Sequence, residues 1–355
     1  MKQVDVAIIG TGWCGGIRAE SCARYPAVSA VHVAEIRPER LAEIAKATNA
    51  KTATKEYSEL LRDSNVEVVF ICATPETTHY PIARDALMAG KHVLLEKPIA
   101  LTFEEADDLI RLARDRKVKF TIGYSQRFNP KFAYVKKAID DGKLGRPVSV
   151  LVSRNITRSL GAKISGRIKL SPAAMEATHD LDFVLWCLEP RKPVRVYAQC
   201  AYGAMREARG PGVPDSMWMM VTMDDGVVFT VGAGWSLPPG YPNFSTTWIE
   251  FLGTEGGVIV DDTHRDVAIR TMQAGTEFPI SSMPGEPVGH TFAGPMAEET
   301  RYFIDCVING GSVLVKPESA RTVMEIYTAA DLSAERNEAV TLPLQPARVA
   351  EVIAR

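Results

Sequence analysis

The stretch V-D-V-A-I-I-G-T-G-W-C-G, from Val4 to Gly15, decides the fold. An apolar run typical of a buried strand ends at Gly10, and a segment that suits a helix follows the glycines. Gly10 permits a tight turn, Gly12 lets the backbone approach a pyrophosphate, and Gly15 allows close packing of helix on strand. The helix N-terminus attracts phosphate charge. This order predicts a dinucleotide-binding unit with Trp13 and Cys14 in its phosphate loop.

The next apolar run, Ala30 to Ala34, is followed by Glu35, twenty positions beyond Gly15. A carboxylate there accepts hydrogen bonds from the adenosine ribose hydroxyls and repels a 2′-phosphate, so it favours NAD over NADP. Arg37 lies close by and is a residue type that pairs with a 2′-phosphate. The sequence therefore predicts NAD as the cofactor and leaves NADP possible.

Strands and helices alternate through residues 1–122. Expected strands cover 66–72, 92–96 and 118–122, and expected helices cover 17–24, 38–48, 78–90 and 102–117. This alternation predicts a doubly wound parallel sheet, which binds ligands at the carboxyl ends of its strands. The residues expected at that edge are Thr74, Pro75 and His79 after one strand and Glu96 and Lys97 after the next.

The pattern changes after residue 122. A helix ending near Gly142, a strand over 147–154, a basic glycine-bearing loop and a helix over 173–188 come first. Expected strands then follow at 194–201, 216–223, 227–235, 246–253, 257–261 and 266–272, and helices over 295–309 and 317–337 close the chain. Successive strands joined by tight turns indicate a mostly antiparallel sheet. We expect two domains, 1–122 and 123–355.

Composition excludes several classes of protein. The chain has 355 residues, 46% of them hydrophobic, and a formal net charge of −2, which argues against binding to a nucleic-acid backbone. No apolar run reaches the roughly 18 residues of a membrane span, so we expect a soluble cytoplasmic protein. The six cysteines form no C-x-x-C unit, and we expect no metal site.

Five groups of residues follow one another along the chain: Gly10 to Gly15, Thr74-Pro75 with His79, Glu96-Lys97-Pro98, Gly123-Tyr124 with Arg127-Phe128, and His179-Asp180-Leu181-Asp182 followed by Trp186. In this order they resemble the glucose-fructose oxidoreductase and inositol dehydrogenase family, the Gfo/Idh/MocA group. The match covers essentially the whole chain, and Glu-Lys-Pro after the fifth strand is its most specific element.

The resemblance implies the fold class α/β, with an N-terminal Rossmann domain and a C-terminal α/β domain built on a large open sheet. It implies oxidation or reduction of a sugar or cyclitol carbon with NAD(H) or NADP(H), with Lys97 and His179 in the catalytic set. It also implies a homodimer or homotetramer formed through the exposed sheet face.

One position departs from the family pattern. Many of the family's dehydrogenases carry an aspartate four residues before the histidine, and this chain has Met175 there. A methionine neither accepts a proton nor orients an imidazole. Glu176, three residues before His179 and about 60° from it around an ideal helix, and Asp182, three residues after it, are the candidates for the missing carboxylate.

Our leading hypothesis is hydride transfer between a ring secondary alcohol and a nicotinamide, with Lys97 and His179 handling the hydroxyl proton. One alternative is a redox-assisted lyase or glycosidase with tightly bound NAD, and another is a non-catalytic nucleotide- or sugar-binding protein. A metal enzyme is disfavoured because His179, with the nearby acids on its helix, lacks a second nitrogen or sulfur ligand. Expected substrate contacts come from Lys97, Tyr124, Arg127, Arg154, Asn155, His179 and Asp182.

Overall fold

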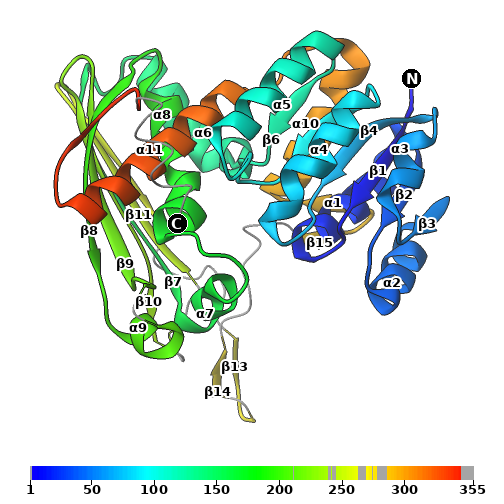
Figure 1. Ribbon diagram of the computed structural model, residues 1–355, viewed down its shortest axis with the longest axis horizontal. Helices are drawn as coiled ribbons and strands as arrows, with labels where there is room; N and C mark the ends of the chain where they lie inside the picture. The colour runs from blue at the N-terminus through cyan, green and yellow to red at the C-terminus, as the bar shows by residue number, and fades with distance from the viewer. Residues whose placement is uncertain are drawn as a thin grey trace. The chain divides into compact units, whose positions relative to one another are not determined.

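The structure, a computed structural model, describes residues 2–210, 212–238, 241, 245–262, 269–273, 275–277 and 286–344 (Figure 1). The chain divides into two compact units. The first comprises Met1–Asn129 and Ser282–Arg321, and the second comprises Pro130–Ser281 and Thr322–Arg355. Both units are discontinuous in sequence, because residues 282–321, which the sequence analysis placed in the second domain, return to the first unit.

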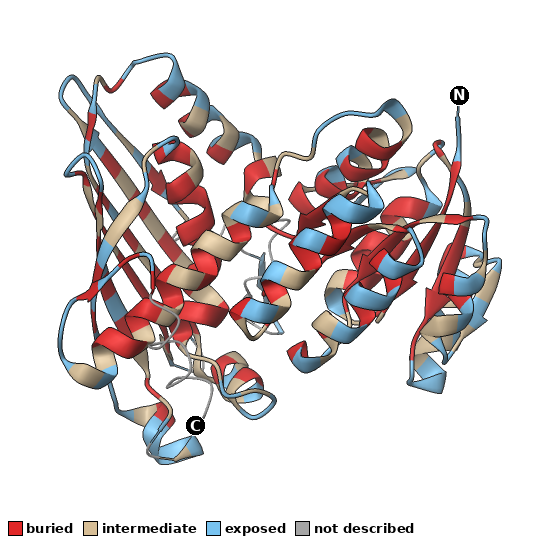
Figure 2. Ribbon diagram, turned by 45° about the horizontal axis from the view of Figure 1, so that its top comes forward, coloured by how far each residue is buried: buried red, intermediate tan, exposed pale blue. Residues whose placement is uncertain are grey.

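A six-stranded parallel sheet forms the centre of the first unit, in the order β3-β2-β1-β4-β5-β6. The predicted doubly wound parallel sheet is therefore confirmed. Strands β1, β4, β5 and β6 are almost entirely buried in Figure 2, which agrees with their apolar sequences, whereas the edge strand β3 has no buried residue. Their bounds are β1 (Val4–Ile9), β2 (Val28–Ala34), β3 (Thr52–Thr54), β4 (Val66–Ile71), β5 (His92–Leu95) and β6 (Phe120–Ile122).

Helices cover both faces of this sheet (Figure 1). Helix α5 (Phe103–Arg116) begins with a capping box of Thr102 and Glu105, in which the Thr102 side chain accepts a hydrogen bond from the Glu105 amide. The other elements of the unit are α1 (Trp13–Ala23), α2 (Pro38–Thr48), α3 (Tyr57–Arg62), η1 (Glu76–Thr78), α4 (His79–Met88), η2 (Ser125–Phe128), β15 (Glu286–Val288), β16 (Thr291–Ala293) and α10 (Pro295–Asn309).

Helix α10 supplies part of the first unit's core from the far end of the sequence. Phe303 lies edge-on against Phe70 of β4, with 6.0 Å between the ring centroids. Ile304 and Val307 belong to the same apolar cluster as Val6 and Ile8 of β1. The Rossmann unit thus depends on a helix that begins about 170 residues beyond the last strand of its parallel sheet.

The second unit holds a seven-stranded sheet in the order β12-β11-β7-β10-β9-β8-β17. Only β7 and β10 pair in parallel, so the expected mostly antiparallel sheet is confirmed. The strands are β7 (Pro147–Thr157), β8 (Pro193–Ala201), β9 (Ser216–Met223), β10 (Val228–Leu237), β11 (Ser245–Gly253), β12 (Gly257–Asp261) and β17 (Val340–Thr341).

Two segments differ from the sequence analysis. Residues 158–165, expected to be a loop, form helix α7 (Arg158–Ser165), whose Gly161 packs against the Trp235 side chain. The helix expected over 173–188 begins as a π-helix, η3 (Ala173–Ala177), and continues as α8 (Thr178–Leu188). The short elements α9 (Ala204–Arg209), β13 (Ile269–Thr271) and β14 (Gly275–Glu277) complete the unit, and part of the strand expected over 266–272 lies outside the described residues.

The second sheet is covered by helices on one face. Phe183 of α8 packs edge-on against Phe132 of α6 (Pro130–Asp140) and against Phe251 of β11. Ser333 of α11 (Pro317–Arg336) accepts a hydrogen bond from the Ala198 amide of β8. The residues that alternate with these point to the opposite face, where several large apolar side chains are exposed. Within the described residues, no helix is both long and apolar enough to cross a membrane.

Replacing Phe303 with alanine tests whether α10 is part of the first unit's core. We expect the Phe303→Ala variant to lose about 3–5 kcal/mol of stability, because a fully buried aromatic side chain is removed. Hydrogen exchange should accelerate in β4 and β1. The Tyr302→Ala control removes a partly exposed ring from the same helix and should cost far less. Equal losses for the two variants would contradict this packing.

Candidate functional site

The glycine loop between β1 and α1 fits a pyrophosphate. Gly10 has φ +82°, and a Cβ there would lie 2.6 Å from the Ala73 backbone. A Cβ on Gly15 would lie 1.9 Å from the Gly10 carbonyl oxygen, whereas a Cβ on Gly12 would meet open space. Helix α1 has no acidic residue in its first turn and no side-chain cap, so its N-terminal amides remain available to an anion. Gly10 and Gly15 are therefore required by packing, and Gly12 leaves space beside the loop.

The two other predicted loop residues differ in their surroundings. The Trp13 side chain is 59% exposed. Burial, helped by the negative charge of Glu96, raises the pKa of the Cys14 thiol to about 12, so the thiol stays protonated at neutral pH. Cys14 thus acts as a small neutral residue within the loop.

Glu35, at the carboxyl end of β2, is attached to the glycine loop. Its Oε2 accepts hydrogen bonds from the amide and the hydroxyl of Thr11, both at 3.0 Å. Its Oε1 accepts from the amide of Arg37 at 3.0 Å and from Nε of the same residue at 2.9 Å. Although burial favours the protonated form, these bonds lower the pKa of Glu35 to about 2. A charged carboxylate therefore lies where an adenosine ribose would bind, with the Arg37 guanidinium folded against it.

The turn after β4 and the turn after β5 are joined by His79. Its Nδ1 lies 2.8 Å from the Pro98 carbonyl oxygen, and its Nε2 lies 3.1 Å from the Ala73 carbonyl oxygen. The side chain is only 2% exposed, and burial lowers the pKa of the imidazole. Thr74 and Pro75 belong to the first of these turns and are half-buried or exposed. His79 therefore connects backbone segments, whereas Thr74 and Pro75 are accessible at the predicted cofactor edge.

Glu96 faces the protein interior. Its Oε1 accepts from Nε and Nη2 of Arg18, at 2.9 and 2.7 Å. Nη2 of Arg18 also donates to Glu299 of α10 at 2.6 Å, and Nη1 donates to the Thr300 hydroxyl at 3.0 Å. The sequence analysis missed Arg18, Glu299 and Thr300, because no local pattern relates α1 to a helix 280 residues away. The neighbouring Lys97 is half-buried at the same strand end.

The end of β6 supplies Tyr124 and Arg127, both of which are buried. A guanidinium nitrogen of Arg127 donates to the Leu314 carbonyl oxygen at 3.2 Å. The predicted residues of the first unit therefore share one edge, since each follows the carboxyl end of β1, β2, β4, β5 or β6. This is the edge at which doubly wound sheets bind nucleotides.

In the second unit, Arg154 of β7 forms a bidentate ion pair with Asp180 of α8, with Nη2 at 2.8 Å from Oδ1. Burial alone would lower the pKa of the Arg154 guanidinium, and the charges of Asp180, Glu176 and Asp262 raise it above the usual value. Glu176 is thus close enough to Arg154 to interact with its charge. This ion pair fixes strand β7 to the helix that carries the predicted histidine.

Met175 is 2% exposed and belongs to an apolar cluster with Ile156, Met205 and Trp235. It lies in the π-helical turn η3, which continues into α8 before His179. Met175 is therefore part of the core of the second unit. His179 is half-buried, and Asp182, one turn later, is fully buried.

Asn155 follows Arg154 on β7, and its side-chain oxygen lies over Gly234 of β10, where an added Cβ would be 2.8 Å away. The predicted residues of the second unit therefore lie on β7, η3 and α8. Lys97 belongs to the first unit and His179 to the second, so their action in one site is part of the function proposed below.

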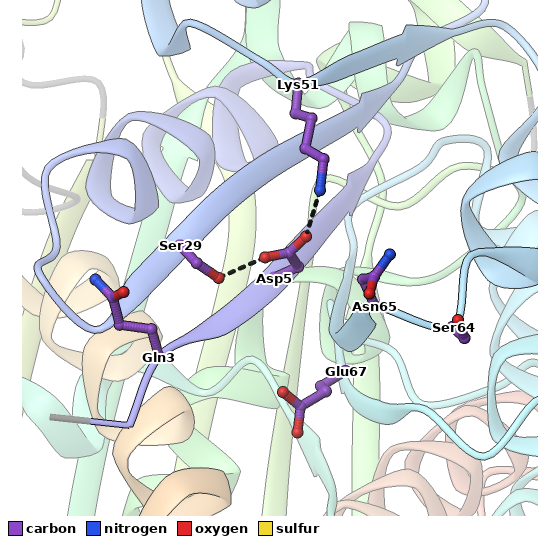
Figure 3. Close-up of a pocket in the computed structure, with 7 residues that line it drawn as sticks. All are labelled: Gln3, Asp5, Ser29, Lys51, Ser64, Asn65 and Glu67. Atoms are coloured by element: carbon purple, nitrogen blue, oxygen red, sulfur yellow. Dashed lines mark hydrogen bonds and ion pairs between the residues drawn. The ribbon is translucent and has the colours of Figure 1, made fainter.

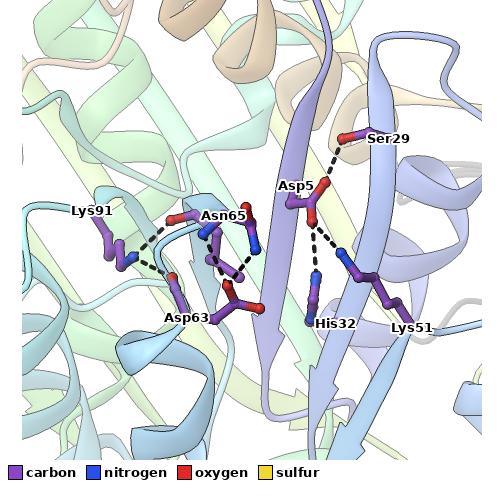
Figure 4. A network of polar contacts seen from close by, with 8 residues as sticks. Asp5, Ser29, His32, Lys51, Asp63, Asn65 and Lys91 are labelled. Atoms are coloured by element: carbon purple, nitrogen blue, oxygen red, sulfur yellow. Dashed lines mark hydrogen bonds and ion pairs between the residues drawn. The ribbon is translucent and has the colours of Figure 1, made fainter.

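A polar hollow of about 430 Å³ lies at the opposite, amino-terminal edge of the first sheet (Figure 3). Asp5 on its wall contacts Ser29, His32 Nε2 at 3.2 Å and Lys51 Nζ at 3.1 Å (Figure 4). Beside it, Asn65 bonds to Asp63. Asp5 thus connects β1 to Ser29 and His32 of β2 and to Lys51, which precedes β3, so we interpret this cluster as a brace of the sheet. Among the described residues, no three His, Cys, Asp or Glu side chains cluster to hold a metal.

Comparison with known proteins agrees with this geometry. The chain is 27% identical to the levoglucosan dehydrogenase of Pseudarthrobacter phenanthrenivorans, over 88% of this chain and 91% of that protein. It is 26% identical to the scyllo-inositol 2-dehydrogenase (NAD(+)) of Bacillus subtilis, over 97% of this chain and 98% of that protein. A solved levoglucosan dehydrogenase in complex with NADH and levoglucosan superposes with a TM-score of 0.80, at 25% identity, covering 97% of this chain and all of that one.

Family profiles cover most of the chain. The profile of an oxidoreductase family with an NAD-binding Rossmann fold matches residues 4–124, and the profile of the GFO/IDH/MocA C-terminal domain matches residues 132–259. Both profiles fall on the corresponding units of the structure. The chain therefore belongs to the GFO/IDH/MocA family of NAD-binding oxidoreductases.

Proposed function

We propose that this protein is an NAD-dependent dehydrogenase that transfers a hydride between the nicotinamide and a ring secondary alcohol of a sugar or cyclitol. The observation that carries the proposal is the alignment of the open glycine loop, Glu35 and Lys97 along one edge of the first sheet. The relatives named above act on levoglucosan and scyllo-inositol, which supports a polyhydroxylated ring as substrate.

Gly10, Gly12 and Gly15 hold the pyrophosphate, and Glu35 accepts hydrogen bonds from the adenosine ribose. Bound NAD supplies the hydride acceptor. The alcohol must lose its hydroxyl proton as the hydride leaves, and the Lys97 amine accepts that proton. The His179 imidazole hydrogen-bonds the same hydroxyl and shares the proton.

In this proposal, another residue supplies the carboxylate that is missing at position 175. Met175 is buried in the apolar cluster, so the carboxylate comes from a different position on the same segment. Glu176 is half-buried and close to Arg154, whereas Asp182 is fully buried. We therefore favour Glu176 over Asp182 as the group that exchanges the proton with Lys97 and His179. Of the other predicted contacts, Asn155 and Tyr124 suit substrate hydroxyls, and the ion pair of Arg154 suits a supporting role.

A redox-assisted lyase or glycosidase is the second candidate function. It would use the same residues, oxidise its substrate transiently and return the hydride to it. The observation that favours this second function is Met175, which lacks the carboxylate expected at that position. A lyase or glycosidase of this kind would differ from the dehydrogenases in its proton relay, and the loss of this carboxylate alters the relay. Net accumulation of reduced nicotinamide separates the two.

We further propose that NAD is preferred over NADP. The pKa of Glu35 lies near 2, so its charge persists at every physiological pH and repels a 2′-phosphate. Arg37, which would attract that phosphate, already makes two side-chain hydrogen bonds to Glu35.

Self-association through the uncovered face of the second sheet is also part of the proposal. Strand register places Tyr197, Met220, Leu151 and Ile259 in one row across this face, with Thr230 between Met220 and Leu151 and Glu250 between Leu151 and Ile259. The four apolar residues are large and 40–53% exposed. Exposed large apolar side chains gathered on one face are typical of an interface between copies.

The test of the proposed function is a panel of sugars, cyclitols, sugar acids and glycosides, incubated with NAD and followed by nicotinamide absorbance. We expect reduction of NAD with at least one polyol. The Lys97→Ala variant should lose about 10²- to 10⁴-fold in kcat, because the general base is removed, and should still bind NAD. Undiminished turnover by this variant would refute the role of Lys97, and cleavage of a glycoside without NADH accumulation would favour the lyase.

The cofactor preference is tested by Glu35→Ser. We expect the Kd for NAD to rise about tenfold or more, since hydrogen bonds to a charged group contribute about 1.5–3 kcal/mol. The Kd for NADP should fall, because the repelling charge is gone and Arg37 is released. Calorimetric titration measures both, with Glu39→Ser, an exposed acid nearby, as the control. An unchanged NAD-to-NADP ratio would contradict this role.

The interface is tested by Met220→Asp. A charge beside Tyr197 in this row should weaken self-association by about 2 kcal/mol or more, and light scattering should show smaller particles. Met272→Asp makes the same change at a fully exposed position and should leave the mass unchanged. A monomeric wild type, or an oligomer that survives Met220→Asp, would exclude this interface.

A further inference from the structure

Lys97 lies just beyond the last backbone hydrogen bonds that join β5 to its neighbouring strands. The last backbone bonds of β5 run from the Glu96 amide to the Ile71 carbonyl at 2.9 Å and from the Gly123 amide to the Leu95 carbonyl at 2.8 Å. The main chain at Lys97 therefore depends on what fixes its two neighbours, Glu96 and Pro98.

Glu96 is fixed by Arg18, whose side chain has no solvent exposure. The guanidinium makes two bonds to Glu96 and is itself held by Glu299 and Thr300. The Arg18 and Glu96 side chains pack closely against Gly123, since a Cβ on Gly123 would lie 3.0 Å from both Arg18 Nη2 and Glu96 Oε2. Rotation of the Glu96 side chain would remove one of the two carboxylate partners of the buried guanidinium, which is unfavourable.

Pro98 is fixed from the other side by His79. The buried imidazole lies between the Pro98 and Ala73 carbonyl oxygens, so it joins the segment after Lys97 to the turn after β4. Gly10 packs directly against that same turn, at the backbone of Ala73. The geometry of Lys97 is thereby connected to the glycine loop as well.

We propose that Arg18 and His79 are positioning residues for Lys97: Arg18 acts through Glu96, His79 acts through Pro98, and together they hold the amine in register with the cofactor loop. This inference rests on the proposed function for its kinetic consequence. Neither residue touches the substrate in this proposal. Glu96, although adjacent to the cofactor edge, serves the lysine and not the cofactor.

The test uses Glu96→Gln, which keeps the shape of the side chain and removes its charge, and His79→Leu, which removes both ring contacts. We expect each to lower kcat by about 10- to 100-fold, the scale of a misplaced catalytic group, with the Kd for NAD unchanged. His79→Asn should recover part of kcat, because its amide nitrogen takes the place of Nδ1. The control Tyr25→Phe removes a 2.6 Å bond from the end of α1 to Asp305 of α10 and should leave kcat unchanged.

A second readout does not depend on turnover. The rate of amine labelling by acetic anhydride is measured at Lys97, relative to the exposed Lys46, by peptide mass spectrometry. We expect this ratio to change several-fold in Glu96→Gln and His79→Leu and to stay constant in Tyr25→Phe. If the wild type reduces no NAD with any polyol, the proposed function fails while the labelling still decides the positioning. Unchanged labelling, or a raised Kd for NAD with unchanged kcat, would overturn the inference.

Discussion

A fully buried guanidinium holds together the parts of the first unit on which its site depends. Arg18 lies one turn into the helix that follows the glycine loop, and it bonds to the strand end beside Lys97 and to α10. Burial of a charge is costly unless its partners are well placed, and here a carboxylate from each side and a hydroxyl satisfy it. The cost of breaking this arrangement fixes the phosphate loop and the strand end relative to each other.

The glycine loop imposes a second constraint at the same edge. Gly15 touches the Gly10 carbonyl, and Gly10 touches the backbone at Ala73, so the ends of the neighbouring strands β1 and β4 are in backbone contact. His79 then extends the connection to Pro98. The candidate cofactor edge is therefore built mainly from backbone packing. The charged side chains of Glu35 and Glu96 add hydrogen bonds to this edge.

The second unit is built on a sheet that helices cover on one face. Its sheet is covered by α6, α8 and α11 on one face, and the Arg154–Asp180 pair fixes α8 to the central strand β7. The buried Met175 in the π-helical turn belongs to an apolar cluster of this core. The opposite face of the sheet keeps several large apolar side chains exposed.

The sequence by itself determined the elements whose cause is local. The turn at Gly10, the alternation of strands and helices, the capping box at Thr102 and the positions of Glu35 and Lys97 at strand ends all follow from neighbouring residues, and the structure contains each of them. The predicted roles of the individual site residues remain predictions. Only the tertiary structure decided that Glu96 faces Arg18, that Arg154 pairs with Asp180, and that residues 282–321 complete the first unit. Arg18 and Glu299 are 281 residues apart, and nothing in either local sequence specifies the other. The partners of a buried charge are determined only in the folded chain. Burial of a charge is costly unless the packing places a counterion beside it, and that counterion can come from any part of the sequence.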